Sequence, residues 1–182
     1  WTHRSSWVVN AAGLYSDRIA ELAGVPVAER GWRLHWVKGN YFTVNPVHQG
    51  RISRLIYPVP PADDSTLGVH ICLDLADQLR LGPDTEPLTE TAQEDYSVDP
   101  GRGADFFAGA ARYLPWLRLE DLTPAFSGLR PKLDPRGFRD FVIQAETGSL
   151  VGLINLVGID SPGLTSAPAI AEEIAAMLQE GD

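Results

Sequence analysis

The sequence predicts a mixed α/β (α+β) fold in which the two ends of the chain form one domain and the middle forms another. A β-prone run followed at once by a helical pattern occurs near the start of the chain and again at its end, which is typical of an α/β domain. Between these units lie several β-prone runs separated by turn residues rather than helices, which favours an antiparallel or mixed sheet.

The opening strand–helix unit lies within the first 26 residues. Residues 6–10 form a short apolar run that ends at the small residues 11–13, so we expect a buried strand followed by a tight turn. Ser16 is predicted to cap a helix over residues 17–23, which ends at Gly24.

The closing unit has the same order. Residues 150–157 form an apolar run, a turn rich in Gly, Pro and Ser follows, and residues 167–179 carry apolar side chains at helical spacing. We expect Thr165 or Ser166 to cap this helix and Pro168 to lie in its first turn.

The middle of the chain is predicted to be a separate sheet domain. In residues 67–75, apolar side chains alternate with more polar ones, which predicts one buried face and one open face with His70 on the open face. The acidic segment 82–105 is predicted to be a surface connection, and residues 106–117 an amphipathic helix. Further strands are expected at 32–44, 55–58, 126–133 and 140–144. The predicted domains are therefore 1–26 with 146–182, and 27–145.

Composition and charge disfavour several classes of protein. The 182 residues carry a net charge of −9 without a run of Lys or Arg, so we expect no nucleic acid partner. No apolar stretch approaches the ~18 residues of a membrane helix, so no transmembrane segment is expected. Cys72 is the only cysteine, which excludes an intrachain disulfide and a cysteine zinc site. No metal site is predicted, and the simplest location is cytoplasmic.

Two turns have the composition of ligand-binding loops. The small residues of 10–13 let the backbone approach a ligand closely, although any tight strand–helix turn selects small residues. The loop 158–166 precedes a helix, whose free N–H groups and positive dipole end can bind an anion. An ordinary capped helix explains the same loop.

Four further positions are candidates for chemistry. Arg130 lies in an apolar strand, where a substrate carboxylate or a structural acidic residue is its natural partner. His70 is either a general base or a solvated surface histidine. Tyr57 is either a core aromatic or a hydroxyl in a substrate cavity. The pair 38–39 (Lys-Gly) either places a cation beside a ligand or forms a bulge.

Five segments, in order along the chain, resemble the D-amino-acid-oxidase-like flavoprotein superfamily. They are 8–17, 38–42, 55–60 followed by 67–70, 128–131 and 161–165. The third resembles the L-2-hydroxyglutarate oxidase/dehydrogenase branch in particular. Because the matches keep the order of the superfamily and span the chain, they are more specific together than any single motif.

The resemblance implies the C-terminal part of an FAD/NAD(P)-binding Rossmann-like domain, with an inserted substrate domain and FAD as cofactor. The implied cofactor contacts are Asn10, Ala11, Ala12, Gly13, Lys38, Gly39, Ser161, Pro162, Gly163, Leu164, Thr165 and Ser166. The superfamily also has an N-terminal G-x-G-x-x-G turn for the FAD pyrophosphate, which this sequence lacks. The chain is therefore predicted to be a C-terminal fragment, inactive alone, whose partner is the missing N-terminal segment of the same protein.

The resemblance also implies a reaction: oxidation of a small 2-hydroxy acid such as L-2-hydroxyglutarate by hydride transfer to the flavin. Arg130 would bind the carboxylate of this small-molecule substrate, Tyr57 would assist, and His70 would take the hydroxyl proton. An alcohol needs such a base and a neutral amine does not. The alternatives are a glycine-oxidase-like amine or amino-acid oxidase and, from a different class, a non-catalytic module that binds a partner.

Overall fold

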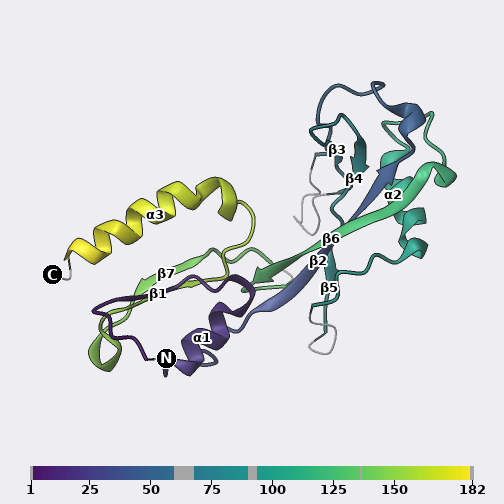
Figure 1. Ribbon diagram of the computed structural model, residues 1–182. Coiled ribbons are helices and arrows are strands. Elements are labelled where there is room, and N and C mark those ends of the chain that lie inside the picture. The colour runs from purple at the N-terminus through teal and green to yellow at the C-terminus, as the bar shows by residue number, and fades with distance from the viewer. Residues whose placement is uncertain (1, 60–67, 90–93, 136, 181–182) are drawn as a thin grey trace. The chain divides into compact units, whose positions relative to one another are not determined.

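A computed structural model describes residues 2–59, 68–89, 94–135 and 137–180, and every structural statement below concerns these residues. The chain divides into two compact units (Figure 1). Unit 1 is Trp1–Trp36 with Arg130–Asp182, and unit 2 is Val37–Leu129. Pro60 and Leu67, which belong to the third matching segment, lie outside the described residues.

Unit 1 contains a three-stranded sheet in the order β1-β8-β7. Strand β1 (Val8–Asn10) is parallel to β8 (Leu153–Val157), and β7 (Val142–Ala145) is antiparallel to β8. Helix α1 (Ser16–Leu22) follows β1 after a short 3-10 turn, and α3 (Gly163–Glu180) follows β8. Both ends of the chain therefore supply a strand–helix unit to the same sheet, as the sequence predicts.

Unit 2 is built on the antiparallel sheet β3-β4-β2-β5, with β6 also paired to β2. The strands are β2 (His35–Val44), β3 (Ile71–Leu73), β4 (Leu79–Leu81), β5 (Glu86–Pro87) and β6 (Leu122–Lys132), and the helix is α2 (Gly103–Ala110). The contacts between residues divide the chain at 36/37 and 129/130, so β2 and β6 each have residues in both units. The domain division at 27 and 145 stays a prediction.

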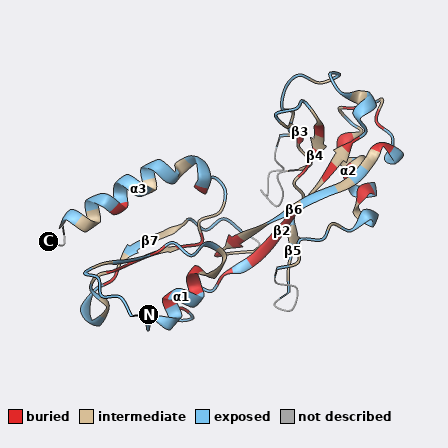
Figure 2. Cartoon of the chain, viewed as in Figure 1, coloured by how far each residue is buried: buried red, intermediate tan, exposed pale blue. Residues whose placement is uncertain are grey.

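One face of the unit 2 sheet forms the core. Phe42, Ile71, Leu79 and Leu81 are each at most 1% exposed, and the Phe42 ring lies 4.7 Å from that of Phe106 on α2. Because side chains alternate along a strand, the intervening residues lie on the opposite, open face. Figure 2 shows the buried residues along β2. The mixed α/β fold with an antiparallel inserted sheet is thus confirmed.

The predicted starts of two helices are wrong. Ser16 is the first residue of α1 rather than its cap, and its Oγ has no hydrogen-bond partner among the described residues. Helix α3 begins at Gly163, so Thr165, Ser166 and Pro168 lie inside it. The Ser166 hydroxyl donates to the carbonyl of Pro162 instead of capping. Proline is tolerated here because the carbonyl left without its N–H partner belongs to Leu164, whose residue is exposed to water.

Two predicted elements are shorter than expected. The strand at 55–58 is a single bridge between Ile56 and Ile71. Helix α2 ends at Ala110, and turns follow at 111–113 and 115–116; Pro115 has no N–H with which to extend the helix through this segment. None of the described helices has the length and hydrophobicity needed to cross a membrane.

Candidate flavin and substrate site

The turn after β1 is held by the Asn10 side chain. Its amide nitrogen donates to the Ser16 carbonyl and to Asn155 Oδ1, both at 2.8 Å, and the side chain is almost completely buried. Ala11 and Ala12 are exposed, and Gly13 has φ +58°, a left-handed conformation that favours glycine. The Asn10 amide therefore organises the turn from inside, and the exposed backbone at 11–13 is the part that can meet a ligand.

A buried polar network continues from this turn. Asn155 Nδ2 donates to Glu146 Oε1 at 3.0 Å, and Arg30 Nη1 lies 2.7 and 2.8 Å from the two Glu146 oxygens. The Glu146 side chain is 2% exposed, and the Arg30 guanidinium also lies over the Trp32 ring. Sequence reasoning missed this network because its members are far apart in the chain and carry no motif.

The loop before α3 presents a helix N-terminus. Leu164 and Thr165 are exposed, so this end of an 18-residue helix is open to solvent. Unsatisfied N–H groups and the helix dipole favour an anion here. Gly158 and Gly163 instead serve packing, because a Cβ would lie 2.5 Å from Leu133 Cγ and 2.4 Å from Ile159 Cγ2 respectively.

Asp160, in the same loop, is half-buried. Its burial raises the pKa of its carboxyl, and the nearby positive charges of Lys132 and Arg130 oppose that shift. Arg130 itself is half-buried at the end of β6, in unit 1.

We expect Asp160→Asn to raise the unfolding temperature at neutral pH. A carboxyl whose pKa is raised by folding stabilises the protein while it is protonated, and this stability is lost as the pH rises through its folded-state pKa. The gain from asparagine should shrink as the pH falls below the ordinary carboxyl pKa. Thermal unfolding from acidic to neutral pH measures this, and a gain that does not depend on pH would contradict it.

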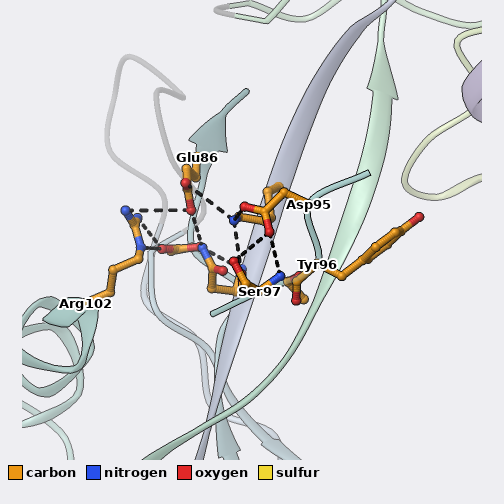
Figure 3. Close-up of polar contacts among 9 residues, drawn as sticks. Glu86, Asp95, Tyr96, Ser97 and Arg102 are labelled. Atoms are coloured by element: carbon orange, nitrogen blue, oxygen red, sulfur yellow. Dashed lines mark hydrogen bonds and ion pairs between the residues drawn. The ribbon is translucent and has the colours of Figure 1, made fainter. Parts of the chain in front are cut away.

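Lys38 is engaged inside unit 2. Its ammonium donates to Asp95 Oδ2 at 2.9 Å and to the Ser97 carbonyl at 3.1 Å, and it lies 3.6 Å from Glu86 Oε1 (Figure 3). The ammonium of Lys38 and the Ser97 hydroxyl hold the pKa of Asp95 well below its usual range. A Cβ on Gly39 would lie 2.8 Å from Pro83 Cβ, so close packing explains this glycine.

The same network continues on the acidic segment. Asn40 Nδ2 donates to Asp84 Oδ1 at 3.0 Å and to Glu86 Oε2 at 2.8 Å, and Arg102 Nε donates to Asp84 Oδ2 at 2.7 Å. The segment 82–105 therefore carries β5 and a set of ion pairs that fasten it to β2, in addition to surface residues. The charges were visible in the sequence, but their pairing depends on the turns that bring them together.

His70 and Tyr57 lie together on unit 2. Their ring centroids are 5.4 Å apart, and Tyr57 is 67% exposed. His70 is opposite Gly82, whose N–H donates to the His70 carbonyl, so its side chain lies on the open face of the sheet. The structure therefore places two of the three predicted substrate residues beside each other.

An apolar groove of about 440 Å³ lies between α3 and the sheet of unit 1. It is lined by Val9, Leu156 and Ile159 and by one side of α3, including Ile170 and Ile174. Strand β1 is the last strand of this sheet among the described residues, and Val8 and Val9 are 55% and 39% exposed. Parallel strands normally have both faces covered, so this side of unit 1 lacks a covering element among the described residues.

Unit 1 is a split α/β unit with an exposed helix N-terminus, and the antiparallel sheet of unit 2 is inserted between its two parts in the sequence. The family model described as "FAD dependent oxidoreductase" (DAO) matches residues 2–177, so the chain belongs to this family of enzymes. This membership confirms the predicted resemblance to the superfamily and agrees with FAD as the cofactor.

Individual relatives are consistent with this membership. The chain is 40% identical to the mitochondrial L-2-hydroxyglutarate dehydrogenase of Arabidopsis thaliana over 92% of its length and 36% of the relative. It is 30% identical to the glycerol 3-phosphate dehydrogenase of Caloramator mitchellensis, covering 93% of this chain and 33% of that protein. The mitochondrial L-2-hydroxyglutarate dehydrogenase of Homo sapiens is 28% identical, and the match covers 97% of this chain and 45% of that protein. The chain thus spans less than half the length of these relatives.

A solved structure has the same fold. The FAD-bound, dithionite-reduced L-alpha-glycerophosphate oxidase of Mycoplasma pneumoniae superposes with a TM-score of 0.73 at 24% identity. The match covers 95% of this chain and 42% of the oxidase. At this identity the likeness defines the fold alone.

Proposed function

We propose that the chain forms the substrate-binding part and the flavin-facing wall of an FAD-dependent enzyme that oxidises a small 2-hydroxy acid such as L-2-hydroxyglutarate. The observation that carries this proposal is the contact between His70 and Tyr57 on an open sheet face, in a chain that belongs to an oxidoreductase family. The 40% identity to a relative named for L-2-hydroxyglutarate supports the choice of substrate.

The described residues of unit 1 fit the flavin end of FAD in two places. The start of α3, residues 163–166, offers N–H groups and a positive dipole end to an anionic edge, and the exposed backbone at 11–13 permits close approach. Lys38 and Gly39 stay proposed cofactor contacts, although both are buried in unit 2 and the Lys38 ammonium is held by Asp95. When bound, FAD supplies the two-electron oxidising chemistry.

The side chains of the chain would hold the substrate and move its proton. Arg130 binds the carboxylate next to the hydroxyl-bearing carbon, because a guanidinium matches a carboxylate with two parallel hydrogen bonds. A ring nitrogen of His70 takes the proton from the 2-hydroxyl oxygen, and the Tyr57 hydroxyl donates a hydrogen bond that keeps the substrate in place.

We further propose that a segment carrying a G-x-G-x-x-G turn completes unit 1. The apolar groove, the edge of β1 and the exposed Val8 and Val9 support this partner, since no other described residue covers their apolar or hydrogen-bonding surface. The relatives have more than half of their length outside the matched part, which leaves room for such a segment. Without it, the chain alone is proposed to be inactive.

Glycerol 3-phosphate is a second candidate substrate. The 30% identity to a protein named glycerol 3-phosphate dehydrogenase favours it. Both candidates present a hydroxyl-bearing carbon close to an anionic group, so both require a base and a cation.

A cytoplasmic location belongs to the same proposal. Its support is the single free thiol of Cys72, whereas several relatives are named as mitochondrial.

The experiment that tests the function replaces His70 by alanine in the flavin-loaded protein. We expect kcat for the 2-hydroxy acid to fall about 100-fold or more, the typical contribution of a general base. His3→Ala, which removes an exposed histidine, is the matched control and should leave kcat unchanged. Unchanged turnover in the His70 variant would refute its assignment as the base.

A further inference from the structure

A second cation lies on the same open face as His70 and Tyr57. Arg80 on β4 is directly opposite Cys72 on β3, and Gly82 is opposite His70. Because residues two apart along a strand share a face, Arg80, Cys72 and His70 lie on one side of this hairpin. The pair Cys72–Arg80 is two residues further along the hairpin than the pair His70–Gly82, which is a distance of about 7 Å along the strands.

The Arg80 guanidinium is held in position by Asp74 and by an aromatic ring, and one of its nitrogens has no hydrogen-bond partner among the described residues. Its Nη2 donates to Asp74 Oδ2 at 2.7 Å, and its Cζ lies 5.3 Å from the centroid of the Phe126 ring. Phe126 in turn stacks on Tyr41 with centroids 4.5 Å apart. Arg80 Nε is buried without a hydrogen-bond partner among the described residues, and the side chain is 33% exposed.

The ion pair with Asp74 does not by itself explain this arginine. Asp74 already accepts hydrogen bonds from the backbone N–H groups of Ala76 and Gln78, at 2.8 and 3.0 Å, within the β3–β4 turn. The bond from Gln78, the bond from Ala76 and the charge of Arg80 all lower the pKa of its carboxyl, so Asp74 has two backbone partners besides Arg80. An arginine has five N–H donors in a planar fork, which suits a second carboxylate.

We propose that Arg80 is a specificity-determining residue that binds a second anionic group of the substrate, so that the site selects hydroxy acids with a distal carboxylate over monocarboxylates. The inference rests on the proposed function, since it takes the open face of unit 2 as the substrate face. A substrate whose hydroxyl lies at His70 would direct an anion several bonds away toward the row of Arg80. A distal carboxylate needs a cation as its partner, and Arg80 supplies one on this face of unit 2.

The test compares L-2-hydroxyglutarate with 2-hydroxybutyrate, which has the same reacting end but no distal carboxylate. In the flavin-loaded Arg80→Gln variant we expect KM for L-2-hydroxyglutarate to rise about 10- to 100-fold, the effect of losing a charge-assisted hydrogen bond, with kcat nearly unchanged. The values for 2-hydroxybutyrate should not change. Arg80→Lys should restore part of the preference, because it retains the charge but not the fork.

Asp74→Asn is the matched control, since it removes the ion pair and retains the guanidinium. It should keep the preference for the dicarboxylate. If Arg80→Gln changed both substrates equally, or if Asp74→Asn abolished the preference, Arg80 would only stabilise the hairpin and the inference would be wrong. Failure of the flavin-loaded wild-type protein, with the G-x-G-x-x-G segment present, to oxidise either hydroxy acid would instead overturn the proposed function, and this inference with it.

Discussion

Replacement of Arg130 by alanine in the flavin-loaded protein is expected to lower kcat/KM for L-2-hydroxyglutarate about a thousandfold. The loss of one partner of a hydrogen-bonded charge pair costs about 2–5 kcal/mol, and each 1.4 kcal/mol is a factor of ten. Arg130 is half-buried in an apolar strand, so water replaces its guanidinium poorly. Steady-state kinetics with the purified variant measure the effect.

Two further variants separate this role from a general effect of charge. Arg130→Lys should recover only part of the loss, because an ammonium cannot make the parallel pair of bonds. Arg112→Ala removes an exposed arginine of unit 2 and should leave kcat/KM within about twofold of the wild type. A value near wild type for Arg130→Ala would refute the assignment of the substrate arginine.

The second large effect concerns stability. Glu146→Gln is expected to lower the free energy of unfolding by about 3 kcal/mol, because removal of one partner from a buried ion pair leaves the other poorly satisfied. The amide nitrogen of the glutamine would replace one carboxylate oxygen and is itself a hydrogen-bond donor. Arg30 Nη1 and Asn155 Nδ2 also donate at this position, so two donors would face each other. Denaturant unfolding followed by tryptophan fluorescence measures the change.

Glu21→Gln provides a matched comparison. Glu21 also accepts hydrogen bonds from an arginine, Arg33, but its side chain is 54% exposed. Solvent screens exposed pairs, so this variant should change stability much less than Glu146→Gln. Equal effects of the two substitutions would contradict the view that burial, rather than pairing, makes the Glu146 network important.

The sequence is informative where local pattern and tertiary structure agree. Alternation of apolar residues placed His70 on the open face, and the strand–helix units at both ends of the chain share one sheet. Local rules failed where a better competing interaction exists. Ser16 has the chemistry of a cap, yet the Asn10 side chain reaches into the turn and a 3-10 turn continues directly into α1.

The polar networks were beyond the reach of sequence reasoning for a different reason. Lys38 was predicted to lie beside a ligand, and its main partner, Asp95, is 57 residues away in an acidic segment. Arg80 could not be predicted as a site residue, because a lone arginine in a short hairpin belongs to no motif. Both become visible only when the register of the sheet and the burial of each nitrogen are known.

The most direct test of the central claim is an anaerobic titration of the flavin-loaded protein, followed by the visible absorbance of the flavin. The account predicts that the absorbance is bleached by L-2-hydroxyglutarate and not by glycine or other small amino acids. Glycerol 3-phosphate in a parallel titration distinguishes the second candidate. Bleaching by an amino acid alone, or failure of the protein with its G-x-G-x-x-G segment to bind flavin, would contradict the assignment of this chain to an oxidase or dehydrogenase of 2-hydroxy acids.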